Sequence, residues 1–546
     1  MKKLLFAMPL VAACLLFLAG CEKGPAEKEY VQPEGFASLV KAHEAKEIFD
    51  CAQVQGDKVV LSFIGGLRLE ILNTSFRIYD CTGVAPAEVL LSESDGEWML
   101  GGHLSGVPYT PQLASADAFP VYVYYDSLTL YVYVSNGKML KFRSMALMQR
   151  IPSVRIYTEG QAPILDKKTY VPGTITVSDP ELLYSDVPEF TAEMGIRGRG
   201  NSTWDFPKKP WKVKLKEKAS LLGMPADKEW CLLANYADRT LIRNIVAMRL
   251  SEICGFSWTP RMCSVEVYLN DKYQGVYTFS EHKKVSSGRV NIDIASAADN
   301  SGDAMTGGYY FEIEQQQDAE TCWWTSMSVP MMFKEPKIPT QVQLSYVKGY
   351  FNDFEKSLYS SDFADPEKGY AKFIDVESFV NYYIVQELTK NIDGNLRKST
   401  FITKERGKKL EMYHLWDFDL TMGACGCFPW EIGGGPEKFW VRDYTPANYR
   451  GDNWFGLMFR DPAFVKRVQE RWNELLPQLR TIPDYIDEQV FILEEAQKRN
   501  FEVWNIKEAV GWVMFPSRGS YENEVGYLKD FYLKRLEWLD GQLALL

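Results

Sequence analysis

Three aspartates in the second half of the chain, Asp393, Asp417 and Asp419, stand among aromatic and apolar neighbours. They lie in the stretch NYYIVQELTKNIDGNLRKSTFITKERGKKLEMYHLWDFDLTMG. Charged side chains are rarely placed in apolar surroundings without a partner or a task. A carboxylate in such a place can accept a proton from an attacking group or hold a divalent cation. The stretch therefore predicts an acid–base or metal site.

The elements around these aspartates are expected to bring them together. SFVNYYIVQELTKN reads as a buried helix that ends near Asn391 and delivers Asp393 into the loop NIDGNLRKS. TFITKERGKKLEMYHLW then alternates as a hairpin, with a turn at Arg406 and Gly407, and carries Asp417 to the end of a strand. The two aspartates are 417 − 393 = 24 residues apart. This order of loop, hairpin and carboxylate pair resembles the catalytic and metal-binding aspartates of protein kinases.

A phosphate-binding segment is predicted upstream, in MGIRGRGNSTWDFPKKPWKVKLKEK. Its glycines allow close approach of the backbone to a ligand: Gly195, Gly198 and Gly200. In the strand that follows, Lys212, Lys214 and Lys216 share one face because side chains alternate with a period of two. One of these lysines could reach the phosphates of a nucleotide. The alternative is a solvated strand edge that carries lysines without a ligand.

Length and charge limit the possible classes. A chain of 546 residues is too long for one ordinary core and indicates two or three domains or lobes. With 46% hydrophobic and 24% charged residues, the composition is that of a globular protein. A formal net charge of −11 gives no overall basic footprint, so we expect no nucleic-acid partner.

The N-terminus MKKLLFAMPLVAACLLFLAGCEKG has two lysines, an apolar run over Leu4–Leu18 and small residues, which is the layout of a secretory signal. LAGC resembles a bacterial lipobox, so we expect cleavage before Cys21 and lipidation of its thiol; simple cleavage is the alternative. The chain would then sit in the cell envelope, on the periplasmic side or the cell surface, held to the membrane by the lipid alone. An exported chain can keep disulfides, and Cys51 with Cys81 is a plausible bridge.

The predicted organisation is an α+β, two-lobed plan preceded by a small antiparallel β domain. Strand-rich runs fill 36–150 after a tether at 22–35; mixed patterns fill 151–340 and helical patterns fill 341–546. The following segments carry the prediction: strands SVRIYTEG, TYVPGTITVSD and WKVKLKEK; a helix RTLIRNIVAMRLSEICG closed by Gly255; a hairpin SVEVYLNDKYQGVYTFSEHKK with ND and QG as turns; and helices PAFVKRVQERWNELLPQL and YLKDFYLKRLEWLDGQLALL.

Five motifs in order closely resemble the CotH family of atypical, spore-coat-protein kinases. They are RGRGNSTWDFPKKPWKVKL, LLGMPADKEWCLLANYADRTLIRNIVAMRL, YQGVYTFSEHKKVSSGRVNID, GGYYFEIE and HLWDFDLTMG, within residues 151–546. The resemblance implies an extracytoplasmic, kinase-like fold in two lobes, with a helix-rich second lobe. It also implies binding of ATP with Mg²⁺ (or Mn²⁺) and phosphorylation of Ser or Thr hydroxyls in a protein partner.

The resemblance also implies roles for particular residues. Asp393 matches the catalytic aspartate and Asp417 the metal-binding aspartate, with Asp419 as a second or outer ligand. The implied nucleotide-binding residues are Lys214 (first choice), Lys212 (alternative), Arg197, Gly198, Gly200 and Glu281, the last orienting a lysine or the metal. Arg243 and Asn244 match family positions as well, but capping and structural hydrogen bonds explain them equally.

Two departures from the kinase pattern keep a second class open. Lys398 stands five residues after Asp393, where a protein kinase has a metal-binding asparagine, unless Asn395 or Asp419 substitutes for it. Thr203 stands where G-x-G-x-x-G requires its third glycine. The alternative is a catalytically inactive surface lipoprotein that binds a partner or acts as a scaffold. A surface glycoside hydrolase would use paired carboxylates but leaves the glycine and lysine segment without a role. The sequence leaves the oligomeric state open.

Overall fold

The computed structural model describes residues 151–180, 182–425, 435–508 and 516–546, and between 49 and 144 the strands alone. The chain divides into two compact units, 1–149 and 150–546. The predicted signal segment with Cys21, the tether and the Cys51–Cys81 bridge lie outside the described residues. Among the helices of the described residues, none combines the length and the apolar character that crossing a membrane requires.

The strands of the first unit pair in three small antiparallel sheets, β1-β2-β3, β4-β10-β9-β8 and β5-β6-β7. Their bounds are β1 Phe49–Gln55, β2 Lys58–Phe63, β3 Arg68–Leu72, β4 Phe76–Asp80, β5 Val89–Ser92, β6 Glu97–Leu100, β7 His103–Pro108, β8 Pro120–Asp126, β9 Thr129–Val134 and β10 Met139–Ser144. Every pair but β4 with β10 joins strands that are consecutive in the chain, as hairpin connections allow.

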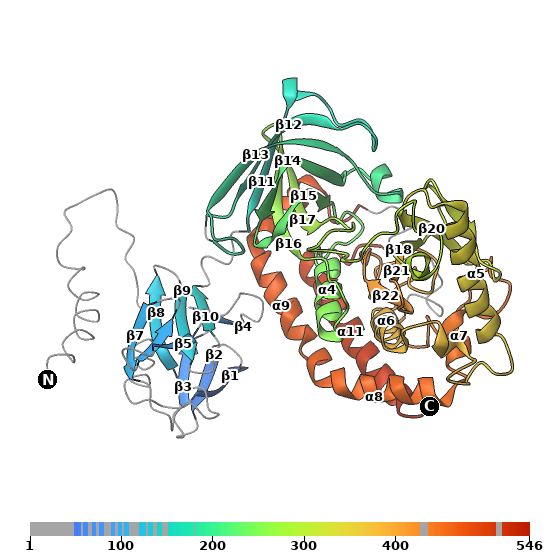
Figure 1. Cartoon of the computed structure of the whole chain (residues 1–546). Coiled ribbons are helices and arrows are strands. Elements are labelled where there is room, and N and C mark those ends of the chain that lie inside the picture. The colour runs from blue at the N-terminus through green and yellow to red at the C-terminus, as the bar shows by residue number, and fades with distance from the viewer. Residues whose placement is uncertain are drawn as a thin grey trace, which may run out of the picture. The chain divides into compact units, whose positions relative to one another are not determined.

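The second unit begins with a closed barrel of seven strands in the order β11-β12-β13-β14-β15-β17-β16 (Figure 1). Their bounds are β11 Ser153–Thr158, β12 Val171–Ser178, β13 Glu189–Gly198, β14 Trp211–Leu221, β15 Met224–Leu233, β16 Met262–Leu269 and β17 Lys272–Glu281. All pairs are antiparallel except β11 with β16, whose parallel pairing closes the barrel. Closure leaves the barrel without free edges.

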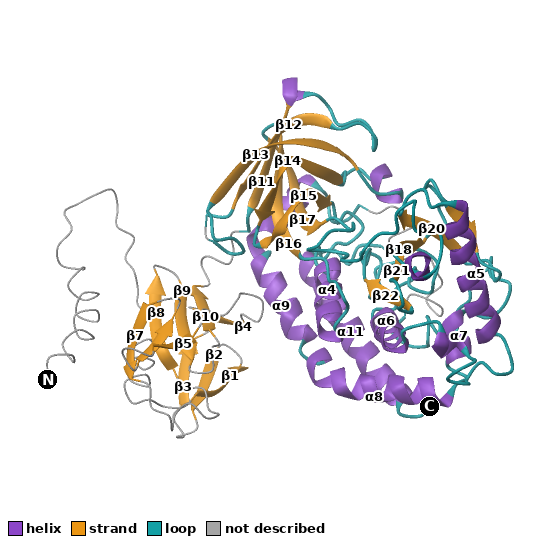
Figure 2. Ribbon diagram, viewed as in Figure 1, coloured by secondary structure: helices purple, strands orange, loops and turns teal. Residues whose placement is uncertain are grey.

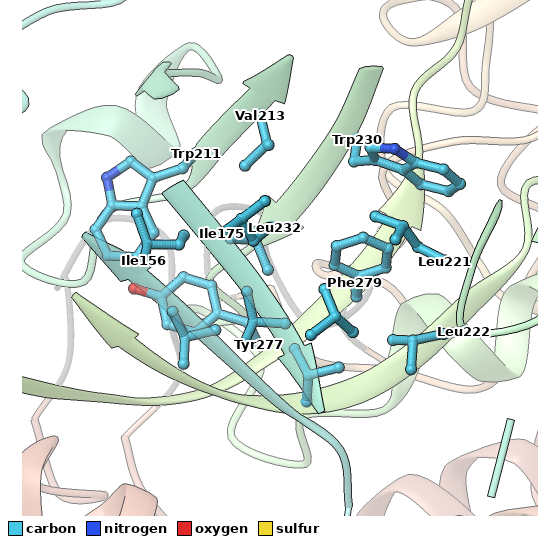
Figure 3. Close-up of a cluster of buried hydrophobic side chains, with 14 of the residues drawn as sticks. Ile156, Ile175, Trp211, Val213, Leu221, Leu222, Trp230, Leu232, Tyr277 and Phe279 are labelled. Atoms are coloured by element: carbon cyan, nitrogen blue, oxygen red, sulfur yellow. The ribbon is translucent and has the colours of Figure 1, made fainter. Parts of the chain in front are cut away.

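The barrel is filled by apolar side chains that alternate along its strands. On β14, Trp211, Val213 and Leu215 point inward, and the lysines between them take the outer face. Figure 3 shows Trp211 beside Tyr277 and Trp230 beside Phe279, with ring centroids 5.2 and 5.3 Å apart. The interior is therefore a packed apolar core.

One helix and one hairpin follow the predicted pattern closely. Helix α4, Arg243–Cys254, is closed by Gly255 in the left-handed conformation (φ 72°). The β16–β17 hairpin turns at Asn270 and Asp271, as predicted. The predicted second turn at Gln274–Gly275 is wrong. Gly275 (φ 99°) lies inside β17, where the register with β16 shifts, so the pair marks a β-bulge.

A five-stranded antiparallel sheet, β19-β20-β18-β21-β22, and a set of helices complete the second unit (Figure 2). The strands are β18 Tyr309–Ile313, β19 Cys322–Trp324, β20 Pro330–Glu335, β21 Thr400–Lys404 and β22 Leu410–His414. The helices are α5 Gln341–Leu358, α6 Val376–Leu388, α7 Trp454–Met458, α8 Pro462–Leu479, α9 Ile482–Ile492, α10 Glu494–Val503 and α11 Tyr521–Leu543. The sheet spans the predicted boundary between residues 340 and 341.

The predicted α+β class is confirmed, with a seven-stranded barrel followed by a C-terminal part rich in helices. Helix α6 packs against β22, α4 and α8. The loop after α6 and the loop after β22 are therefore held by one packed assembly, and these two loops carry the three aspartates.

Candidate functional site

Asp417 lies on the turn that follows β22, in the left-handed conformation with φ 61°. The backbone N–H of buried Phe418 donates to Asn244 Oδ1 at 2.7 Å, and the Thr421 hydroxyl donates to the Phe418 carbonyl at 2.7 Å. The carboxylate of Asp417 is exposed and accepts a hydrogen bond from Ser399 Oγ at 2.8 Å. The turn is fixed by buried contacts while its carboxylate stays open to a ligand.

Asp393 lies in the loop after α6, as predicted. Its N–H donates to Asn391 Oδ1 at 3.1 Å, and its carbonyl accepts the N–H groups of Arg397 and Lys398, each at 3.3 Å. Its carboxylate is half-buried and stands 3.5 Å from Arg397 Nη1. Burial raises the pKa of Asp393 and the charge of Asp417 adds to this, while Lys398 and Arg397 oppose it. A raised pKa makes this carboxylate a better proton acceptor.

Residues 397–399 connect the two aspartates. The side chain of Arg397 reaches Asp393, and the side chain of Ser399 reaches Asp417, so Lys398 stands between residues that touch both. Ser399 has φ 46° and Leu396 has φ 63°, conformations that cost energy for residues other than glycine. Such conformations persist where the surrounding structure fixes them.

Asp419 is half-buried beside the other two aspartates. Burial raises the pKa of Asp419 to about 7, and the charges of Asp417, Asp238 and Asp393 act in the same direction. The three aspartates thus repel one another, a repulsion that a cation would relieve. Among the described residues no group of three or more His, Cys, Asp or Glu side chains is placed to hold a metal ion. A metal here would depend on one or two carboxylates, the mode typical of Mg²⁺ with a phosphate ligand.

Helix α4 of the barrel side anchors the aspartate turn. Besides the Asn244 contact, Arg243 Nε donates to the Thr421 carbonyl at 2.9 Å, and its Nη1 pairs with Asp238 at 2.5 Å. Asp238 in turn accepts the Arg243 N–H at 2.8 Å, at the start of the helix. Arg243 and Asn244 therefore make structural hydrogen bonds that hold the Asp417 turn against the barrel side.

The structure separates the two candidate lysines of β14. Lys212 is 8% exposed, with Nζ 2.9 Å from His282 Nε2 and 3.4 Å from Glu229 Oε1. Burial lowers the pKa of Lys212, against the charge of Glu229, and burial lowers the pKa of His282 well below its ordinary value. Lys214 is exposed and lines an open groove of about 660 Å³ on the barrel with Glu193.

Glu281, predicted to orient a lysine or the metal, is fully buried at the end of β17. Its Oε2 accepts the Arg261 N–H at 2.9 Å, and its Oε1 lies 3.7 Å from Arg289 Nε. Burial raises the pKa of Glu281, and the two arginines oppose this. The carboxylate partner of Lys212 is instead Glu229, which the sequence did not single out.

Close packing explains why Gly198 and Gly200 of the glycine segment are glycines. A Cβ on Gly198 would lie 2.5 Å from the Trp204 ring, and one on Gly200 (φ 87°) would lie 2.1 Å from Thr203 Oγ1. Arg197 donates to the Lys167 carbonyl and stacks over Tyr170. None of these observations points to a ligand.

Arg199, which the sequence did not single out, places the glycine segment near the aspartates. Its guanidinium lies 5.7 Å from the ring centre of Trp416, the residue before Asp417. Lys283 lies 5.6 Å from the same ring. The glycine segment, the end of β17 and the Asp417 turn therefore meet around Trp416.

Two further carboxylates lie on β18 and just beyond it. Glu312, 4% exposed, pairs with Lys283 at 2.9 Å and Lys334 at 2.6 Å. Burial alone would raise the pKa of Glu312, but the two ammonium groups lower it to about 2. Burial raises the pKa of Glu314 to about 7, with Lys398 and Lys283 opposing. The sequence FEIE could have indicated these two glutamates, because it places two charges on one face of an otherwise apolar strand.

The Glu312 pair predicts an acid-dependent loss of stability. A carboxylate whose pKa falls from 4.5 to about 2 on folding stabilises the protein by about 3 kcal/mol above pH 4.5. This contribution is lost as the pH falls from 4.5 towards 2. We expect the free energy of unfolding in urea to be lower for Glu312→Gln than for the wild type at pH 7, and this difference to shrink below pH 4.5. The exposed Glu217→Gln is the control, and a deficit that does not change with pH contradicts the assignment.

Comparison with known families identifies the family of the chain. The sequence model of the family described as "CotH kinase protein" matches residues 196–539, which include Gly198, Gly200, Lys212 and all three aspartates. No curated protein matches the chain. The chain belongs to the CotH family.

Proposed function

We propose that the chain is an atypical protein kinase that transfers the γ-phosphoryl group of ATP to a Ser or Thr hydroxyl of a protein partner. The observation that carries the proposal is the connection of Asp393 to Asp417 through Arg397 and Ser399. The connection supports the proposal because phosphoryl transfer requires a proton acceptor and a metal-binding carboxylate close together. Lys212, buried on the barrel, would supply a positive charge that offsets the charge of the phosphates.

In this proposal the fold works as two kinase-like lobes. The barrel with α4 is one lobe, and the five-stranded sheet with the remaining helices is the other. The nucleotide would lie near Trp416, where Arg199 and Lys283 come from the barrel side and Asp417 follows from the sheet side. These two basic side chains suit the negative charge of the nucleotide phosphates.

The residues have separate tasks in the transfer. Asp393 accepts the proton of the attacking hydroxyl as its oxygen forms a bond to the γ-phosphorus. The bond from that phosphorus to the bridging oxygen breaks, and ADP leaves with the electron pair. Lys212 neutralises charge on the phosphates, and Arg397 holds Asp393 in place.

The oxygen-only donor set fits Mg²⁺ or Mn²⁺, since hard cations prefer carboxylates and phosphates. Asp417 would hold the ion, with Asp419 as a second or outer ligand. When bound, the ion would supply positive charge that offsets the charge of the phosphates. The mutual repulsion of the three aspartates is the feature of this chain that supports the fit.

Nucleotide affinities of two variants distinguish the proposed role of Lys212 from that of Lys214. Lys212→Met should weaken binding of a non-hydrolysable ATP analogue by about tenfold or more, because a hydrogen bond to a charged group is lost. Lys214→Met is the matched control on the same strand and should change affinity by less than about twofold. Isothermal titration with Mg²⁺ present measures both. A larger loss of affinity in Lys214→Met would make Lys214 the phosphate-binding lysine, as the sequence analysis first expected.

The function itself is tested by incubating the purified full-length chain with γ-labelled ATP and Mg²⁺ or Mn²⁺. Label should appear on the protein or on an added Ser- and Thr-containing substrate, and Asp393→Asn should remove it. The signal-like N-terminus with LAGC supports a further part of the proposal, a location in the cell envelope with a lipid on Cys21. Mass spectrometry of the purified N-terminus tests it.

The second candidate is a surface protein that binds a partner without turnover. Lys398 in place of the kinase asparagine is the observation that favours it. A ligand that binds only the folded state raises the melting temperature. No shift with ATP and Mg²⁺, together with no label transfer, would favour this candidate.

A further inference from the structure

Lys398 occupies the stretch that joins the two central aspartates. Its backbone N–H donates to the Asp393 carbonyl, while its neighbours Arg397 and Ser399 contact the carboxylates of Asp393 and Asp417. Residue 398 therefore lies between two residues whose side chains contact the carboxylates of Asp393 and Asp417. Its side chain is half-buried.

The ammonium of Lys398 acts on two carboxylates without pairing with either. Its charge lowers the pKa of Asp393 and of Glu314 against the effect of burial. Within the described part of the chain no carboxylate lies within 4.0 Å of its Nζ in an ion pair, whereas Lys212 and Lys283 each have one. A cation near the site with no fixed partner is placed to meet an anion from outside.

We propose that Lys398 takes the place of the second divalent cation of the phosphoryl-transfer site, so that the chain works with one metal ion. The inference rests on the proposed function and names how that site neutralises the phosphates. Protein kinases hold a second ion with an asparagine five residues after the catalytic aspartate, and here that position is a lysine. A metal ion and an ammonium at one point would repel each other.

The remaining donors agree with a single ion. Among the described residues no set of three or more acidic, His or Cys side chains forms a metal cage. Asp417 is the exposed carboxylate, and Ser399 orients it. One ion on Asp417 and one ammonium on Lys398 would flank the phosphates, as two ions do in a kinase.

The test counts metal ions. The full-length chain is titrated with Mn²⁺ in the presence of a saturating non-hydrolysable ATP analogue, and bound Mn²⁺ is measured by electron paramagnetic resonance. We expect one ion per nucleotide complex in the wild type and two in Lys398→Asn, which restores the kinase residue. Lys408→Asn, an exposed lysine paired with Glu405 in the β21–β22 turn, is the control and should bind one.

A second variant tests the phosphate contact. Lys398→Met should still bind one Mn²⁺ but should weaken nucleotide affinity by about tenfold or more. Two ions in the wild type, or unchanged affinity in Lys398→Met, overturns this inference and leaves the proposed function standing. No nucleotide binding by the wild type or by Lys398→Asn overturns the proposed function and this inference with it.

Discussion

Asp417→Asn should lower phosphoryl transfer by roughly a thousandfold or more while the protein stays folded. The change removes the negative charge that would hold the metal and keeps the shape of the side chain. Asparagine is the right replacement because Asp417 has φ 61°, a conformation that asparagine tolerates and alanine resists. The measurement is label transfer from γ-labelled ATP at saturating Mg²⁺, with circular dichroism to verify the fold.

A matched control exists in the barrel. Asp271, in the β16–β17 turn, has nearly the same backbone conformation, with φ 62°. Asp271→Asn should leave transfer unchanged, so a loss there would show that the substitution acts through the backbone. Ser399→Ala, which removes the hydrogen bond to Asp417, should cost activity by roughly tenfold or less. Normal transfer in Asp417→Asn would remove Asp417 from the mechanism.

Local patterns predicted the elements that carry the aspartates. The apolar run before Asn391 gave α6, and the alternation around Arg406 and Gly407 gave β21 and β22 with their turn. Both depend on neighbours in the sequence, where periodicity is informative. The order of the motifs then identified the family, because five motifs in sequence are hard to match by chance.

Long-range pairing was beyond the same reasoning. The parallel contact of β11 with β16 closes the barrel across more than a hundred residues, and β18 pairs with β21 across the predicted lobe boundary. The alternation of side chains along a strand predicted that Lys212 and Lys214 lie on the same face of β14. It could not predict which of the two lysines other segments would bury. Glu229 and His282, from two other segments, cover Lys212 and leave Lys214 exposed.

A buried ion pair between α6 and α11 predicts the largest change in stability. Glu387, at the end of α6, and Arg535, on α11, are each about 1% exposed or less, with Oε1 and Nη2 2.6 Å apart. The same carboxylate accepts the N–H groups of Trp440, Val441 and Arg442 at 2.6 to 3.1 Å. Its hydrogen-bonding capacity is fully used, which is what makes a buried charge tolerable.

Removing one partner of this pair should destabilise the unit strongly. Arg535→Met leaves the Glu387 charge buried without its cation, and we expect the free energy of unfolding in urea to fall by about 3 to 5 kcal/mol. Arg535 also donates to the carbonyls of Pro436 and Lys438, so the segment that follows the site loses support as well. The control is Lys534→Met on the same helix, whose exposed pair with Asp530 should contribute at most about 0.5 kcal/mol.

A double-mutant cycle separates the ion pair from the other contacts of Arg535. If the buried charge is the cause, Glu387→Gln should lessen the cost of Arg535→Met, giving a coupling energy of about 1 kcal/mol or more. Additive losses would instead assign the effect to the carbonyl contacts of Arg535 and to the packing of its side chain. Because Glu387 joins α6 to the backbone at 440–442, a large coupling would mean that Arg535 on α11 helps to fix the helix that delivers Asp393.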